Sequence, residues 1–127
     1  MSKLKISDNT NGENSSESKF IKELNVAFAT NDVEFITEHM TEDIIWDMVG
    51  DKLLSGKAAV ASALKEMAFN KVDTLTLNHI ISHSSKGSSQ GEIGMNGSTY
   101  SFCDIYEFTN EGKIMLRKMI SYVIKLS

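Results

Sequence analysis

The chain has 127 residues, of which 41% are hydrophobic and 24% are charged, which is the composition of one globular domain. It carries 13 Lys and Arg against 17 Asp and Glu, a net charge of −4 that argues against a dedicated nucleic-acid-binding protein. One cysteine allows neither an internal disulfide nor a cysteine-based zinc site. There is no apolar run long enough to span a bilayer and no apolar signal core near the N-terminus. We therefore expect a cytoplasmic protein that binds neither membranes nor nucleic acid.

The first half of the chain has the periodicity of helices. Residues 1–15 are predicted to form a flexible polar tail, because they offer too little apolar surface to offset the entropy of ordering. A single domain is expected over residues 16–127. Within it, Phe20, Ile21, Leu24 and Phe28 form one apolar stripe of a first helix. A short second helix follows, and Asn31 is predicted to cap it.

The second half has the alternation of strands. A short strand is predicted at 44–49, and a third helix begins at 55–56. Further strands are predicted near 75–81, 92–95, 98–108 and 114–126, with a loop at 84–89 and a type I′ turn at Asn96-Gly97. The order α-α-β-α-β-β-β-β predicts an α+β fold. Three helices would pack on a curved antiparallel sheet and enclose a cone-shaped apolar pocket of the kind that holds small molecules.

Asp104 departs from the alternation of its strand. It shares a face with Tyr100, Phe102, Tyr106 and Phe108. A carboxyl group buried among aromatic rings usually takes up a proton, so we expect Asp104 to be neutral and able to donate a hydrogen bond to a carbonyl or a developing enolate. The alternatives are that this face points outward at one end or that Asp104 binds a helix terminus.

Two further polar residues are candidates for the pocket. Asp47 lies near the end of the strand at 44–49, where a carboxylate at the mouth of an apolar pocket would act as a general base. It could instead anchor the turn that follows at Gly50. His79 alternates with Leu75 and Leu77 and is predicted to face inward, either as a third polar group of the site or as a hydrogen-bonded core residue.

Two segments resemble a known family. Trp46-Asp47-Met48-Val49-Gly50, followed by Ser55-Gly56-Lys57-Ala58-Ala59-Val60, resembles the segment of bacterial ketosteroid isomerases that carries their catalytic base. Cys103-Asp104-Ile105-Tyr106-Glu107-Phe108 is similar to the strand that carries the protonated acid of their oxyanion site. The resemblance covers about residues 17–124 and indicates the SnoaL-like group of the nuclear transport factor 2-like superfamily. It implies the cone-shaped fold, a base role for Asp47 and an oxyanion-stabilising role for Asp104. Leu24 falls where that family has its oxyanion tyrosine.

The expected function is therefore the binding of a small hydrophobic carbonyl compound by a cofactor-independent isomerase or a polyketide cyclase-like enzyme, with no metal ion. The alternative is a non-catalytic ligand-binding or protein-association module, which Leu24 favours because leucine cannot donate a hydrogen bond. A homodimer through the open face of the sheet is also predicted, since Ile105, Ile120, Tyr122 and Ile124 would otherwise be exposed. The residues predicted to line the pocket are Leu24, Phe28, Leu64, His79, Met95, Tyr100, Phe102, Tyr106 and Met119.

Overall fold

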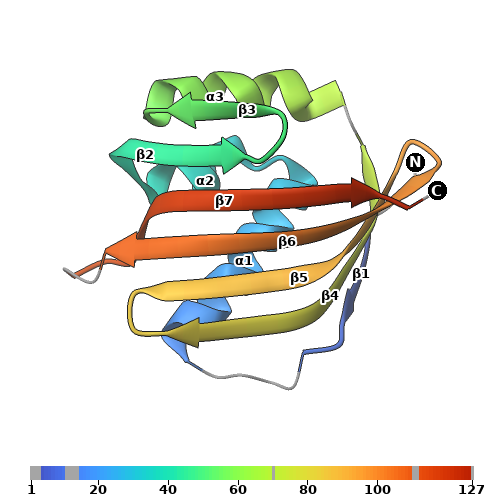
Figure 1. Ribbon diagram of the computed structural model, residues 1–127, viewed down its shortest axis with the longest axis horizontal. Helices are drawn as coiled ribbons and strands as arrows, with labels where there is room; N and C mark the ends of the chain where they lie inside the picture. Colours follow the sequence, from blue (N-terminus) through green and yellow to red (C-terminus); the bar gives the residue numbers. More distant parts are fainter. Residues whose placement is uncertain (1–3, 11–14, 70, 110–111, 127) are drawn as a thin grey trace.

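The computed structural model describes residues 4–10, 15–69, 71–109 and 112–126. Within these residues, three α-helices cover one face of a seven-stranded sheet (Figure 1). The elements in chain order are β1 (Lys5–Asp8), α1 (Ser16–Thr30), α2 (Val33–Glu38), β2 (Met40–Met48), β3 (Lys52–Ser55), α3 (Lys57–Glu66), a 3-10 turn (Met67–Phe69), β4 (Val72–His83), β5 (Lys86–Met95), β6 (Ser98–Thr109) and β7 (Met115–Lys125). The predicted α+β class is confirmed.

The sheet is mixed, with the strand order β1-β4-β5-β6-β7-β2-β3. The central strands pair antiparallel, whereas β1 pairs with β4 and β2 pairs with β7 in parallel. The predicted element order lacks β1 and β3, and the predicted purely antiparallel sheet is wrong at these two parallel pairs. Both missing strands have four residues and are largely exposed, so neither carries the apolar alternation that identifies a strand.

Part of the predicted flexible tail is ordered. Lys5–Asp8 pairs with residues 74–77 of β4, and the Asn9 backbone N–H continues this pairing by donating to the Leu77 carbonyl at 2.8 Å. The Asp8 carboxylate forms an ion pair with Lys22 of α1, which holds the pKa of Asp8 down at about 2. Backbone pairing and one ion pair replace the apolar burial that this segment lacks.

Capping residues set the ends of the first two helices. Ser15 caps α1 by accepting a hydrogen bond from the Ser18 N–H at 3.1 Å, and Asn31 ends it in a left-handed conformation with φ of 56°. Asp32, rather than the predicted Asn31, caps α2 by accepting from the Phe35 N–H. α1 crosses β4 and β5, and α3 lies against β2 and β3 (Figure 1). Leu24 and Ile21 of α1 are completely buried in the core beneath the sheet.

A bulge in β4 reverses the predicted orientation of His79. The register with β5 shifts between Leu77 and His79, and this extra residue turns Ile80 inward and leaves His79 exposed. Gly91 pairs with Leu77 at this point, and a Cβ on Gly91 would collide with the Thr76 carbonyl oxygen. The backbones of the two strands thus approach closely where the bulge forms.

The two hairpins that flank β5 differ in how well they are predicted. Asn96 and Gly97 have φ of 54° and 78°, so the predicted turn with positive φ at both central residues is confirmed. The loop predicted at 84–89 is wrong for most of its length, because β5 begins at Lys86. The start of β5 is rich in Ser and Gly and so has the composition of a loop, although β5 pairs with both β4 and β6 from Lys86 onward.

Candidate functional site

A cavity of about 490 Å³ lies between the inner face of the sheet and the helices. Its walls are mainly apolar, which is typical of sites for small hydrophobic molecules. Polar atoms enter from only a few side chains of its lining. The lining residues are Asn25, Phe28, Ala29, Asn31, Trp46, Met48, Val49, Gly50, Asp51, Leu64, Met67, Val72, Leu75, Ile93, Met95, Phe102, Asp104, Met119, Ser121 and Val123.

Asp104 lies on the inner face of the sheet, in a cross-strand row of polar residues. Ser89 of β5 is its register partner on one side and Ser121 of β7 on the other. The row continues to Met48 of β2, which also lines the cavity. The face of β6 that carries Asp104 is therefore the inner one, as expected.

Asp47 lies on the opposite face of the sheet. Its register partners are Ile120 of β7 and Leu53 of β3, and Ile120 in turn pairs with the exposed Ile105. Successive side chains of a strand alternate between faces, so the neighbouring Trp46 and Met48 line the cavity and Asp47 does not. The prediction that Asp47 and Asp104 share one pocket is wrong.

Hydrogen bonds fix the Asp104 carboxyl group from two directions. The Tyr106 hydroxyl donates to Asp104 Oδ2 at 3.5 Å, and the Ser121 hydroxyl also hydrogen-bonds the carboxylate. The indole N–H of Trp46 donates to Ser121 Oγ at 2.8 Å. Since this bond occupies Ser121 Oγ as an acceptor, the Ser121 proton is free to point toward Asp104.

A second branch of this network reaches helix α1. Asn25 Nδ2 donates to Tyr106 Oη at 3.1 Å, to Ser89 Oγ at 3.2 Å and to the Ile21 carbonyl at 2.9 Å. Ser89 Oγ and Tyr106 Oη are 2.7 Å apart. Complete burial, together with the neighbouring Asp104 charge, raises the pKa of Tyr106 well above its ordinary value, so Tyr106 stays protonated. It is therefore a permanent donor for the carboxylate.

The balance of these effects brings the pKa of Asp104 close to neutral pH. Burial raises its pKa from 3.8 to about 6, and the hydrogen bonds from Ser121 and Tyr106 oppose the increase. A pKa of about 6 lies close to neutral pH, so both the charged and the neutral form of Asp104 are accessible there. The direction of the shift is the one expected for a carboxyl group buried among aromatic rings.

The other predicted lining residues divide into two sets. Phe28, Leu64, Met95, Phe102 and Met119 line the cavity. The other four do not line the cavity: Leu24 and Tyr106 are completely buried, Tyr100 is half-buried and His79 is exposed. The lining thus contains two carboxyl groups, those of Asp104 and of the exposed Asp51, and lacks the predicted histidine.

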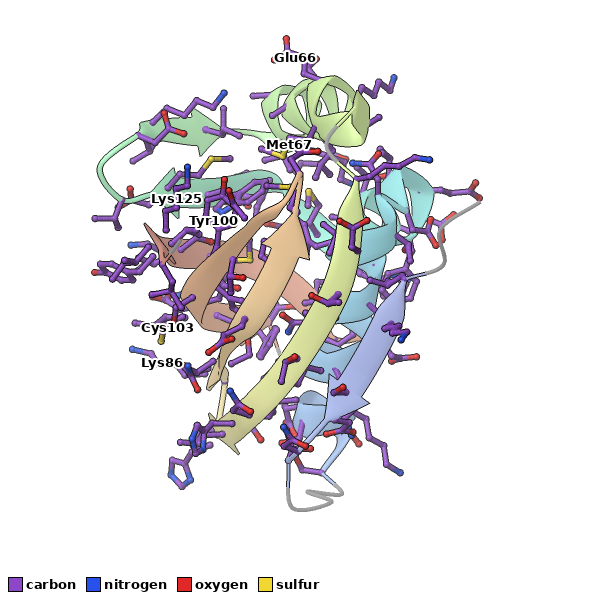
Figure 2. All side chains as sticks on the ribbon, turned by 90° about the vertical axis from the view of Figure 1, so that its right-hand side faces the viewer. Glu66, Met67, Lys86, Tyr100, Cys103 and Lys125 are labelled. Atoms are coloured by element: carbon purple, nitrogen blue, oxygen red, sulfur yellow. The ribbon has the colours of Figure 1, made fainter. Side chains whose placement is uncertain are left out.

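Sequence reasoning missed several residues of the site. Asn25 interrupts the apolar stripe of α1, which is a visible signal of a buried polar group, but its partners lie more than sixty residues away along the chain. The hairpin residues Val49, Gly50 and Asp51 reach the cavity because β3, which the sequence does not reveal, folds them back. Cys103 faces away from the helices, on the outer side of β6 (Figure 2).

Two other properties bear on the class of site. Among residues 4–10, 15–69, 71–109 and 112–126, no three His, Cys, Asp or Glu side chains gather as metal ligands. Of the helices in these ranges, none has the length and hydropathy needed to cross a bilayer.

Residues 21–116 match the SnoaL-like domain family. The chain belongs to this family. The SnoaL-like domain resembles a putative ketosteroid isomerase from Kribbella flavida (TM-score 0.74, 9% identity, 87% of this chain and 78% of the other). It also resembles nuclear transport factor 2 from Cryptosporidium parvum (TM-score 0.72, 12% identity, 83% and 89%). A third similar structure is the epoxide hydrolase/cyclase-like enzyme SalBIII of salinomycin pyran ring formation (TM-score 0.68, 21% identity, 83% and 88%).

These identities are low, so the three structures establish the fold and leave the activity open. None of the curated proteins compared with the sequence matches it. The nuclear transport factor 2-like architecture predicted from the sequence is confirmed.

Proposed function

We propose that the SnoaL-like domain binds a small hydrophobic carbonyl compound and that Asp104 is its general base. The observation that carries the proposal is the buried Asp104 carboxyl group, held by the Tyr106 and Ser121 hydroxyls, at the wall of an apolar cavity. A general base is most effective when its pKa is close to the working pH, and the pKa of Asp104 is about 6.

One carboxyl group is sufficient for a proton shuttle. The Asp104 carboxylate would take the proton from a carbon next to the carbonyl group, which leaves an enolate and a protonated Asp104. Return of that proton to another carbon of the conjugated system moves a double bond and regenerates the carboxylate, which is an isomerisation. If the enolate carbon instead attacks a second carbonyl group, Asp104 returns the proton to the new alkoxide, which is an aldol cyclisation. Both routes conserve protons without a cofactor.

The similarity to the putative ketosteroid isomerase supports this class of chemistry. Two observations favour the second candidate, a non-catalytic ligand-binding module. Leu24, which the resemblance places where ketosteroid isomerases have their oxyanion tyrosine, is completely buried, and Asp47 is on the far side of the sheet. Loss of one oxyanion donor typically lowers a rate by about a hundredfold or more.

Exchange of carbon-bound protons distinguishes the two candidates without knowledge of the natural substrate. The protein would be incubated in D₂O with 2-tetralone, a two-ring ketone that fits an apolar cavity, and the α-proton signals followed by NMR. We expect acceleration by the wild type, a loss of at least about a hundredfold in Asp104→Asn, and an unchanged rate in Asp47→Asn, the matched carboxyl on the outer face. Binding of 2-tetralone without acceleration would identify a binding module, and equal rates in wild type and Asp104→Asn would remove Asp104 from the mechanism.

We also propose a homodimer through the outer face of the sheet. Ile105, Tyr122, Ile124 and Leu53 are exposed there, and an apolar face of this kind is seldom left open to water. A second copy of the same face is the simplest cover, since a two-fold axis pairs identical surfaces. Light scattering at micromolar concentration should give twice the 14.1 kDa mass of the chain, and Ile105→Glu should give the single mass. A wild type that is monomeric under these conditions would refute the dimer.

A further inference from the structure

Asn25 presents an unused hydrogen-bond acceptor to the cavity. The residue is only 6% exposed and lies in the middle of α1, and it lines the cavity beside Phe28. All its hydrogen bonds are made by Nδ2, which donates to the Ile21 carbonyl, Ser89 Oγ and Tyr106 Oη. The Ile21 carbonyl can only accept, so it fixes the amide with nitrogen toward the network and Oδ1 away from it.

Asn25 Oδ1 takes no part in the hydrogen bonds that Asn25 makes within the described ranges of the chain. The one enclosed and unpaired side-chain polar atom in these ranges is Thr41 Oγ1, so Asn25 Oδ1 is not an enclosed orphan. Because Asn25 lines the cavity, this oxygen is the polar atom of the side chain that is left for a ligand. An acceptor in this position can be hydrated while the cavity contains water, and an apolar ligand would remove that hydration.

We propose that Asn25 Oδ1 is a recognition site for a hydrogen-bond donor, a hydroxyl or an N–H group, on the ligand that meets Asp104. This inference rests on the proposed function, because it describes the ligand of the same cavity. A ligand without such a donor desolvates the oxygen and leaves it unpaired, which binding sites built to hydrogen-bond a hydroxyl strongly disfavour. The ligand class is thus a hydroxylated hydrophobic compound rather than a plain ketone or hydrocarbon.

The network also limits the distance between the two polar groups of the ligand. Tyr106 Oη lies 3.1 Å from Asn25 Nδ2 and 3.5 Å from Asp104 Oδ2, so it bridges the two side chains. Asn25 Nδ2 and Asp104 Oδ2 are therefore at most two hydrogen bonds apart, and Oδ1 belongs to the same amide group. Polar groups on one small ring, in a 1,3 or 1,4 relationship, span such a distance, whereas groups at opposite ends of a long molecule do not.

Matched probes test this geometry. 5-Pentylresorcinol carries two hydroxyls on one ring and an apolar tail, and its monomethyl ether retains one hydroxyl but loses the second donor. Both would be titrated at pH 7.5 into the full chain and their Kd values compared. In the wild type we expect the diol to bind about tenfold more tightly than the ether, because the remaining hydroxyl pairs with Asp104 and the ether oxygen faces Asn25 Oδ1.

Two variants distinguish direct recognition of the ligand by Asn25 from an indirect effect through the hydrogen bonds around Asn25. Asn25→Leu keeps the branched shape of the side chain but removes both the Oδ1 acceptor and the Nδ2 donor, and the preference for the diol should fall to about unity. Ser89→Ala removes a completely buried neighbour that bonds Asn25 and Tyr106 but does not line the cavity, and the preference should remain. An unchanged preference in Asn25→Leu, or its loss in both variants, would overturn the proposal, as would the failure of both probes to bind the wild type.

A readout in the wild type alone covers the case in which Asn25→Leu does not fold. The Asn25 side-chain amide resonances should shift with the diol and much less with the ether, and equal shifts would contradict recognition by Oδ1. The outcome is independent of the exchange assay. A protein that prefers the diol but does not exchange the protons of 2-tetralone retains the Asn25 subsite and loses the catalytic role of Asp104.

Discussion

Asp104 and Ser121 face each other across β6 and β7 as register partners, and Trp46 of β2 donates its indole N–H to the same Ser121 at 2.8 Å. Three strands thus cooperate to hold one carboxyl group. This arrangement makes the hydroxyl of Ser121 a directed donor, so its removal has a predictable effect on the protonation of Asp104.

Ser121→Ala should raise the pKa of Asp104 further above 6, by about one unit, because the ionised form loses a hydrogen bond while burial is unchanged. The measurement is a ¹³C NMR titration of the Asp104 carboxyl group. Ser88→Ala is the matched control, since Ser88 Oγ donates to the backbone carbonyl of Asp104 at 2.9 Å rather than to its side chain. A pKa that moves equally in both variants would mean that the Ser121 hydroxyl has no specific role.

The elevated pKa of Asp104 also predicts how stability depends on pH. Below the unfolded value of 3.8 the carboxyl is protonated in both the folded and unfolded states, and between 3.8 and about 6 only the unfolded chain ionises readily. The free energy of unfolding should therefore fall as pH rises through this window, by about 3 kcal/mol in total. Asp104→Asn should lack this decrease. Urea unfolding at pH 4 and pH 7 tests it, and the same difference in wild type and variant would contradict the assignment.

Trp46→Phe tests the branch of the network that begins at the indole. The Trp46 ring lies 5.3 Å from the Phe28 ring, centroid to centroid, and a phenylalanine at position 46 can still make an aromatic contact there. The N–H donor to Ser121 Oγ is lost. We expect the free energy of unfolding to fall by about 1 kcal/mol. Chemical denaturation measures the change. An unaltered stability together with an unaltered Asp104 pKa would show that the Trp46–Ser121 hydrogen bond has no energetic importance.

Gly91→Ala tests the close approach of β4 and β5 beside the bulge. The new methyl group would collide with the backbone oxygen of Thr76, and we expect a loss of about 3 kcal/mol or failure to fold. Gly94→Ala is the control, because its Cβ would meet the Thr74 side-chain hydroxyl, which can rotate away. Thermal unfolding of both variants measures the difference, and equal stability of the two would be inconsistent with the bulge geometry.

The sequence predicts the helices, the Asn96-Gly97 turn and the inward face of Asp104, because each depends on local periodicity or on the preferences of one dipeptide. It cannot predict the direction of His79, because the β4 bulge shifts the alternation by one residue without a local signal. The alternation of Trp46 and Asp47 is visible, but which of them faces inward depends on the parallel pairing of β2 with the distant β7. The pKa of Asp104 likewise depends on donors from other strands.

The direct test of the account is the titration of the Asp104 carboxyl group in the free protein and with 2-tetralone bound, by ¹³C NMR. We predict a pKa of about 6 in the free protein and a further change on binding, while the Asp47 signal is unaffected by the ligand. An Asp104 that titrates near 3.8 and does not respond to 2-tetralone would contradict the claim that this carboxyl group is the base of a ligand-binding cavity.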